Sequence, residues 1–266
     1  MEQRREYKEN NDKREEYEEQ LKVFDFSNLP LPLKGKNNIR IFYNNINGLE
    51  INSAVAAKIN NKVQKQKHLF TQDVEEHTKI ESFLKQTSNW NVDVSILSEP
   101  CIEWRDTIPR KIIQDIGKKY NCNGNWTVST SECYSGSFVK PGGSLIYNTG
   151  SIVGKIVERG SDPWGYGRWT YVRYQGKAGK TLLLIGAYRV GQRSGNPGPT
   201  TAWYQQKVLL SKDNREIAPE DAFITDIETW LVEKKSDTTE VLLALDANEQ
   251  WTKQSSIRGL ASRMKL

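Results

Sequence analysis

The strongest constraint on the fold is an apolar run, Val241-Leu242-Leu243-Ala244-Leu245, that leads directly into Asp246-Ala247-Asn248. A continuous apolar run of this length is typical of a strand that is covered on both faces. Polar residues that follow such a strand lie where α/β sheets bind their ligands. We therefore expect a buried strand that presents Asp246 and Asn248 to a ligand.

Size and charge set broad limits. The chain has 266 residues, of which 36% are hydrophobic, so it can bury one large core, and its length alone does not exclude two smaller ones. The formal net charge of +5 fits a polyanionic partner without indicating one. No apolar run approaches the roughly 20 residues of a membrane span, and the N-terminus carries charges in place of a signal core. We expect no membrane partner and an intracellular location, nuclear or cytoplasmic.

The cysteines indicate neither of the usual cysteine-based scaffolds. Cys101, Cys122 and Cys133 are odd in number and contain no CxxC pair. They therefore predict neither a disulfide framework nor a zinc site. A reducing compartment is the simplest context for them.

The N-terminal residues 1–36 differ from the rest of the chain. Mixed charges run to Glu19, which favours a solvated helix or tail, and the prolines at 30 and 32 end any helix before a short linker. We place the domain boundary near Asn37. Residues 37–266 then form one domain.

Strand and helix patterns alternate within that domain. Apolar and alternating segments predict strands at 38–43, 92–97, 143–147, 152–157, 168–172, 181–188 and 241–245. Helical periodicity predicts helices at 72–87, across Ile108, Ile112, Ile113 and Ile116, at 201–210, and after Pro219 with Phe223, Ile227, Trp230 and Leu231 inward. The Asn/Gln/Lys-rich stretch at 60–67 is typical of an exposed loop.

Polar groups follow three of the predicted strands: Asn45, Glu99, and Asp246 with Asn248. If the strands share a sheet, or lie in two packed sheets, these ends can meet in one cleft. Each group also has a plainer explanation. Asn45 suits a turn, Glu99 can be an ordinary exposed carboxylate, and Asp246 with Asn248 can cap a helix. Their joint order favours a shared site.

The set of groups suits phosphate chemistry. Mg²⁺ prefers oxygen ligands and is often held by one or two carboxylates plus substrate phosphate. Asp246 can orient or deprotonate a metal-associated water, while Asn45 and Asn248 can donate hydrogen bonds to phosphate oxygens.

The joint pattern resembles the endonuclease/exonuclease/phosphatase superfamily. The matching segments, in order, are Asn45-Ile46-Asn47-Gly48-Leu49, Asp93 to Glu99, Gly142 to Tyr147, Arg168 with its following strand, Leu184 to Tyr188, and Leu245 to Asn248. The resemblance covers about residues 38–266. The amino-acid sequence of the first segment is especially similar to that of the endonuclease domains of LINE-type retrotransposons, which precede a reverse transcriptase.

The resemblance implies both a fold and a reaction. The fold is α/β, with two mixed β-sheets packed face to face and helices outside, a four-layer α/β sandwich that is incomplete at the C-terminus here. The reaction is hydrolysis of a phosphoester that depends on Mg²⁺ or Mn²⁺. In the family pattern Glu99 is the metal ligand, Asn45 lies beside the metal and phosphate, Asp246 positions the attacking water, Asn248 binds the scissile phosphate, and Tyr188 contacts phosphate.

The chain departs from the family pattern in three places. Leu245 stands where the family usually has Gly, and Arg189 follows Tyr188 where a proline often comes next. The family's C-terminal Ser-Asp-His element has no counterpart. His68 and His77, the only histidines, lie nine positions apart and on roughly opposite faces of any helix, so neither replaces it. We therefore expect a fragment with impaired activity, completed by a downstream part of the same polypeptide with a reverse transcriptase as its candidate further domain.

Basic and aromatic side chains supply candidate nucleic-acid contacts. Arg168, Arg189 and Arg193 lie near the proposed cleft and can meet the phosphate backbone of DNA. Basic residues between 105 and 119 can do the same or simply form a solvated helix face. Trp164, Trp169 and Trp203 can stack on bases, although core positions are the more usual place for such residues.

Three functions remain open from the sequence. The first is a metal-dependent DNA endonuclease from a retrotransposon-like element. The second is a phosphatase of the same fold that acts on a phosphoinositide or another small phosphoester. The third is a non-catalytic nucleic-acid-binding remnant, whose signature is salt-sensitive binding without cleavage.

Overall fold

The computed structural model describes residues 33–35, 38–49, 79–121, 123–133, 139–191 and 197–266. The chain divides into two units, residues 1–36 and residues 37–266. All helices and strands named here belong to the second unit. Some of the residues on which predictions were made lie outside the described residues. They are His68, His77, Cys122, Arg193, the 60–67 loop and residues 72–78 of one predicted helix.

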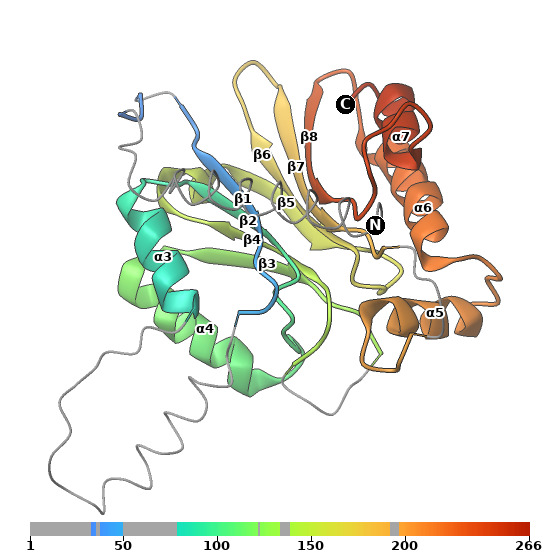
Figure 1. The fold of residues 1–266 in the computed structure, drawn as a ribbon. Helices are drawn as coiled ribbons and strands as arrows, with labels where there is room; N and C mark the ends of the chain where they lie inside the picture. The colour runs from blue at the N-terminus through green and yellow to red at the C-terminus, as the bar shows by residue number, and fades with distance from the viewer. Residues whose placement is uncertain (1–32, 36–37, 50–78, 122, 134–138, 192–196) are drawn as a thin grey trace, which may run out of the picture. The chain divides into compact units, whose positions relative to one another are not determined.

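Two four-stranded mixed sheets form the centre of the second unit (Figure 1). The first sheet has the order β1-β2-β4-β3, with bounds Ile41–Asn45, Val94–Ser98, Ser144–Asn148 and Asn125–Ser129. The second sheet has the order β5-β6-β7-β8, with bounds Ile156–Ser161, Trp169–Gln175, Thr181–Tyr188 and Thr239–Asp246. β1 and β2 are parallel, as are β7 and β8, and every other neighbouring pair is antiparallel.

Helices cover the outer face of each sheet. Helices α3 (Lys79–Asn89) and α4 (Thr107–Tyr120) pack on the first sheet, and α6 (Pro219–Lys234) and α7 (Ser256–Met264) pack on the second, as Figure 1 shows. Helix α5 (Ala202–Lys212) and the 3₁₀-helix η1 (Gly150–Lys155) complete the described elements. The predicted fold class, two mixed sheets packed face to face with helices outside, is confirmed.

The two sheets pack through a shared apolar layer that includes Val94, Ile96, Ile146, Val172 and Leu184. Gly186 marks a close approach between them, because a Cβ atom built there would lie 2.4 Å from Ile96 Cγ2. Only a residue without a side chain fits this position without movement. The two sheets therefore approach each other closely two residues before the end of β7.

One residue of the apolar face predicted for helix α4, Ile108, does not face the core. Asp106 caps the helix by accepting a hydrogen bond from the Ile108 N–H at 2.9 Å, so Ile108 lies in the first turn beside solvent. It is 49% exposed, whereas Ile112 and Ile113 are buried. In α6 the whole prediction is confirmed, because Pro219 occupies the first turn and all four predicted apolar residues are buried.

Several strand boundaries differ from the prediction. Residues 150–155 form η1, so the predicted strand at 152–157 begins only at Ile156. β1 runs to Asn45, which therefore ends a strand and does not lie in the following loop. β3 was not predicted from the sequence. No helix among the described residues is both long and apolar enough to cross a membrane.

The expectation that residues 241–245 are fully buried was wrong. Within the described strands β8 pairs only with β7 and forms an edge of the second sheet, and Leu242 remains 39% exposed. Both faces of β8 are nevertheless apolar, because Val241, Leu243 and Leu245 pack toward the α6 and α7 layer while Ala244 packs toward the first sheet. An edge strand between two apolar layers produces the same sequence pattern as a central one.

Candidate active site

The predicted site residues come from the carboxyl ends of the two parallel strand pairs. Asn45 ends β1 opposite Ser98, and Glu99 follows directly after β2. Tyr188 ends β7 opposite Asp246, the last residue of β8. Each sheet thus delivers two polar side chains from a neighbouring pair of strand ends.

The Asn45 amide joins these two ends. Its Nδ2 donates to Glu99 Oε2 at 2.8 Å and to Asp246 Oδ2 at 2.6 Å. Its Oδ1 accepts the Asn47 N–H at 2.9 Å, which fixes the amide with the nitrogen toward the carboxylates. The three side chains that the sequence placed at strand ends thus meet at one point, while the roles assigned to them stay predictions.

Backbone geometry turns Glu99 toward Asn45. Glu99 adopts a left-handed conformation with φ of 52°, which is uncommon for a residue other than glycine, and its N–H donates to Gly143 O at 3.1 Å. Gly143 has φ of 87°, and a Cβ atom there would lie 2.8 Å from Ser129 O. The carboxylate is therefore held by a main-chain contact that depends on a glycine.

The Tyr188 hydroxyl lies against Glu99. The residue is 7% exposed, and burial raises the pKa of its hydroxyl strongly, with a hydrogen bond to Glu99 adding to the shift. The hydroxyl therefore stays protonated at neutral pH. Its predicted contact with phosphate stays a prediction, since in this structure its hydrogen bond is to the carboxylate.

Ser98 and Tyr43 are site neighbours that sequence reasoning missed. Ser98 Oγ donates to Ala187 O at 3.0 Å and so links the two sheets beside the site. Because that bond uses its only proton, the Tyr43 hydroxyl is the donor in the 3.1 Å contact between Tyr43 Oη and Ser98 Oγ. The available sequence signal was spacing, since Tyr43 precedes Asn45 by two positions and shares its face of β1.

Asn248 is engaged within the protein. It is left-handed with φ of 46°, its N–H donates to Asp246 Oδ1 at 3.3 Å, and its Nδ2 donates to Arg189 O at 2.8 Å. Its side-chain nitrogen thus fixes the loop after β8. The predicted contact between Asn248 and the scissile phosphate stays a prediction.

Lys79 also contributes to the site region without a sequence signal. It begins α3, and its Nζ donates to Ile46 O at 2.5 Å. This bond holds the loop that follows Asn45 against the helix. A lysine at a helix start gives no sign of such a partner in the sequence.

Arg168 does not serve the predicted phosphate contact. The residue is 1% exposed, and its guanidinium donates to Asp162 and Asp226, with two of the bonds at 2.6 Å. It also lies 4.6 Å from the ring centroids of Tyr166 and Trp169. A buried cation is retained only when such partners neutralise it, so this arginine is structural.

The three tryptophans that were candidates for stacking on bases also have contacts within the protein. Trp169 is fully buried and packs against Phe223 and Trp230, in line with the core alternative. Trp164 is partly buried in the same layer, and Trp203 Nε1 donates to Glu220 Oε2 at 2.9 Å.

The donor set fits a hard divalent cation. Two carboxylates lie within reach of one amide, and Mg²⁺ commonly takes one or two protein carboxylates, waters and substrate oxygens. Within the described ranges no group of three or more His, Cys, Asp or Glu residues could hold a metal. At this point Glu99 and Asp246 present carboxylate oxygens, whereas Asn45 presents its NH₂ group, a donor, toward them.

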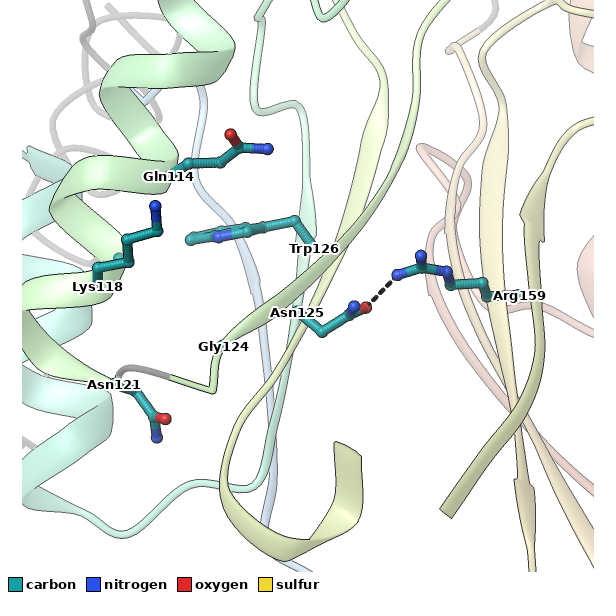
Figure 2. A pocket seen from close by; sticks show the side chains of 8 residues that line it. Gln114, Lys118, Asn121, Gly124, Asn125, Trp126 and Arg159 are labelled. Carbon is teal, nitrogen blue, oxygen red and sulfur yellow. Dashed lines mark hydrogen bonds between the residues drawn. The ribbon is translucent and has the colours of Figure 1, made fainter. Parts of the chain in front are cut away.

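A pocket of about 340 Å³ lies at the other end of the first sheet, with its lining side chains drawn in Figure 2. It is lined by Gln114, Gly117, Lys118, Asn121, Gly124, Asn125, Trp126 and Arg159. Asn125 is in register with Asn148 and Val94, four positions along β2 from Ser98, which is about 13 Å of strand. The pocket is therefore separate from the carboxylates.

Comparison with known proteins gives only distant matches. No family model and no curated protein matches the chain. Among solved structures, an endonuclease/exonuclease/phosphatase family protein from Leptotrichia buccalis matches with a TM-score of 0.47 and 10% identity, covering 85% of this chain and 73% of that chain. The mannosyl-6-phosphatase Bt3783 of Bacteroides thetaiotaomicron matches with 0.42 and 12%, covering 85% and 71%.

A third match is a humanized D. rerio TDP2, with a TM-score of 0.42 and 12% identity over 85% of this chain and 69% of that chain. The name of the first of these proteins is that of the superfamily which the sequence motifs resemble. At this level of similarity the matches do not identify a reaction or a substrate.

Proposed function

We propose that the chain is a hydrolase that cleaves phosphodiester bonds with a bound Mg²⁺ or Mn²⁺ ion, and that DNA is its substrate. The contact of one amide, Asn45, with the carboxylates of Glu99 and Asp246 supports this assignment most directly. Two acidic side chains held together at strand ends suit a divalent cation and a phosphate.

Each residue of the site has a proposed role. Glu99 and Asp246 would hold the ion, which when bound neutralises charge on the phosphoryl oxygens. Asp246 also accepts a proton from, or orients, the attacking water. The Asn248 amide would keep one N–H on Arg189 O and donate the other to the phosphate as negative charge builds there. The Tyr188 hydroxyl and the Asn45 amide would exchange their present bonds to Glu99 and Asp246 for bonds to the phosphate.

A polymeric substrate is favoured over a small phosphoester by the exposure of the site. Asn45 and Asn248 are both exposed. Small-molecule sites usually enclose most of their ligand, whereas a duplex needs an open surface. The net charge of +5 also favours a polyanion. We also propose that the chain originates from a retrotransposon-like element, and the sequence of residues 45–49 is the sole basis for this proposal.

The test is nicking of supercoiled plasmid DNA with added Mg²⁺. Glu99→Gln and Asp246→Asn keep the shape of each side chain and remove its charge, and we expect each to lower the nicking rate by about 10³-fold. Glu240→Gln is the matched control, because Glu240 is an exposed carboxylate near the other end of β8. It should nick at the wild-type rate.

Two other outcomes would redirect the assignment. Hydrolysis of a small phosphomonoester with no nicking of DNA would support the phosphatase alternative. Salt-sensitive DNA binding with no hydrolysis of either substrate would support the binding module. Nicking by both charge-removing variants within threefold of wild type would overturn the site itself.

A further inference from the structure

Arg189 connects the end of β7 to the loop that carries Asp246 and Asn248. It follows β7 directly and is 5% exposed. Its N–H donates to Asp246 O at 2.9 Å, one step beyond the last residue pair of the two strands. Its own carbonyl accepts Asn248 Nδ2 at 2.8 Å. The main chain of Arg189 thus contacts both site residues.

The Arg189 side chain reaches the same loop by a second route. Its Nη1 donates to Ala247 O at 3.2 Å and lies 3.7 Å from Glu249 Oε2, while its Nε donates to Glu220 O at 3.0 Å in the first turn of α6. The Glu220 carboxylate itself accepts Trp203 Nε1, so it is the α6 backbone that anchors the guanidinium. The peptide between Asp246 and Asn248 is therefore fixed to a rigid helix.

Glu249 extends this arrangement to α7. Its carboxylate accepts the N–H groups of Ser256 and Ile257 at 3.0 and 3.1 Å and the Ser256 hydroxyl at 2.9 Å. The loop that begins at Asp246 is thus held at one side by α6 through Arg189 and at the other by the start of α7. Loss of the buried guanidinium would remove the bond that the Ala247 carbonyl accepts from it, which is costly.

We propose that Arg189 is a positioning residue that fixes the Asp246 carboxylate and the Asn248 amide in the geometry required for hydrolysis. This inference rests on the proposed function. The Arg189 guanidinium acts through the Ala247 carbonyl and the Glu249 carboxylate, in the loop that carries the site residues. Because displacement of a reacting group by about 1 Å can cost 10²-fold in rate, loss of the guanidinium should lower kcat much more than it changes KM.

The control is a second arginine with the same kind of contacts at the opposite end of the same sheet. Arg173 Nε donates to Glu158 Oε2 at 2.9 Å, and its Nη2 donates to Lys234 O at 2.8 Å at the end of α6. Its Nη1 donates to Thr239 Oγ1 at 3.1 Å at the start of β8. Arg173→Ala therefore removes a comparable set of bonds from the same sheet and helix, but far from Asp246.

The experiment compares Arg189→Ala and Arg173→Ala in the full chain, at a temperature where thermal melts show both folded. We expect Arg189→Ala to lower kcat about 100-fold with KM within threefold, and Arg173→Ala to leave kcat within threefold. Guanidinium ion at concentrations far below those that unfold proteins should restore at least fivefold of the lost kcat in Arg189→Ala. Urea, a neutral molecule of the same shape, should restore none.

Hydrogen–deuterium exchange gives a reading that needs no activity. Arg189→Ala should raise exchange in the peptide that spans residues 246–249 at least tenfold, and Arg173→Ala should not. If wild type hydrolyses no phosphoester, the proposed function fails, and the exchange result alone decides the positioning role. Unchanged exchange at 246–249, or equal loss of kcat in the two variants without guanidinium rescue, would overturn the proposal.

Discussion

The two sheets have the same pattern of strand directions but support their site residues by different means. Each has its parallel pair at one edge, β1 with β2 in the first sheet and β7 with β8 in the second. In the first sheet Glu99 is turned by left-handed backbone and by a main-chain bond to Gly143. In the second sheet a buried arginine holds the loop after Asp246.

Because the supports differ, the two halves of the site should be sensitive to different substitutions. The support of Glu99 depends on Gly143, a position where a side chain does not fit, so a single added methyl group there should disturb it. The second sheet depends on charge and on hydrogen bonds to carbonyl groups, so it should respond to removal of a charge and to pH. Ser98, which joins the two sheets, should affect both halves.

The largest effect is expected for Gly143→Ala. The added Cβ would lie 2.8 Å from Ser129 O in a residue with φ of 87°, and we expect a loss of about 3 kcal/mol in the free energy of unfolding. Gly150→Ala is the matched control, because Gly150 has φ of 64° and nothing within 4 Å of its Cβ position. Urea unfolding should show about 1 kcal/mol for the control. Equal losses would mean that the close contact at Gly143 is unimportant, and the comparison between the sheets would fail.

Ser98→Ala should have a smaller effect that is shared by both sheets. The substitution leaves Ala187 O without the bond it accepts at 3.0 Å, in a fully buried position. We expect a loss of about 1.5 kcal/mol in the free energy of unfolding. Tyr43→Phe, which removes only the partner of Ser98 Oγ, should lose less than half of that. A larger loss for Tyr43→Phe would place the important bond in the first sheet alone.

The smallest effect is expected for Glu249→Gln, and it should depend on pH. Burial alone would raise the pKa of Glu249, but the bonds from Ser256 and Ile257 and the charge of Arg189 lower it below its usual range. A lowered pKa contributes stability that is present above the unfolded value of about 4.3 and is lost as the pH falls through the folded value. Wild type should therefore exceed the variant by about 1 kcal/mol at pH 7, a difference that urea titrations should find vanishing in strong acid.

Glu240→Gln, on an exposed position of the same strand, should show no such pH dependence. If the wild-type advantage at Glu249 instead persisted in acid, the carboxylate would not be stabilised by its neighbours. The second sheet would then have no greater dependence on charge than the first.

The pattern of strands and polar strand ends predicted the meeting of the polar groups, whereas the fold class was predicted from the resemblance of the motifs to a known superfamily. Apolar strands followed by polar residues remain visible along the chain, and so do the helix start at Pro219 and its apolar face. The strand β3 was missed because Asn125–Ser129 is short and only partly buried, with a mixed polar sequence. Residues 152–155 were placed in a strand because a 3₁₀ turn can contain the β-branched residues, here Ile152 and Val153, that strands favour.

The roles of the arginines were beyond sequence reasoning for a physical reason. Arg168 and Arg189 are both basic residues that follow or precede a strand, and nothing in the chain indicates whether such a charge faces solvent or acids. Their partners, Asp162 and Asp226 for Arg168 and the Ala247 and Glu220 carbonyls for Arg189, are set by the folded structure. Arg189, which stands where the family pattern often has a proline, thus has structural contacts that its position in the sequence does not indicate.

The bond between Asn45 and Asp246 joins residues 201 positions apart. During synthesis at about 5–20 residues per second, the Asn45 segment therefore leaves the ribosome roughly 10–40 s before its partner. The first sheet can be complete only after β4 ends at Asn148, which is 246 − 148 = 98 positions before Asp246, so for roughly 5–20 s Glu99 would lack its opposite carboxylate. If the chain hydrolyses phosphodiesters as proposed, hydrolysis by a nascent chain would begin only after β8 has emerged.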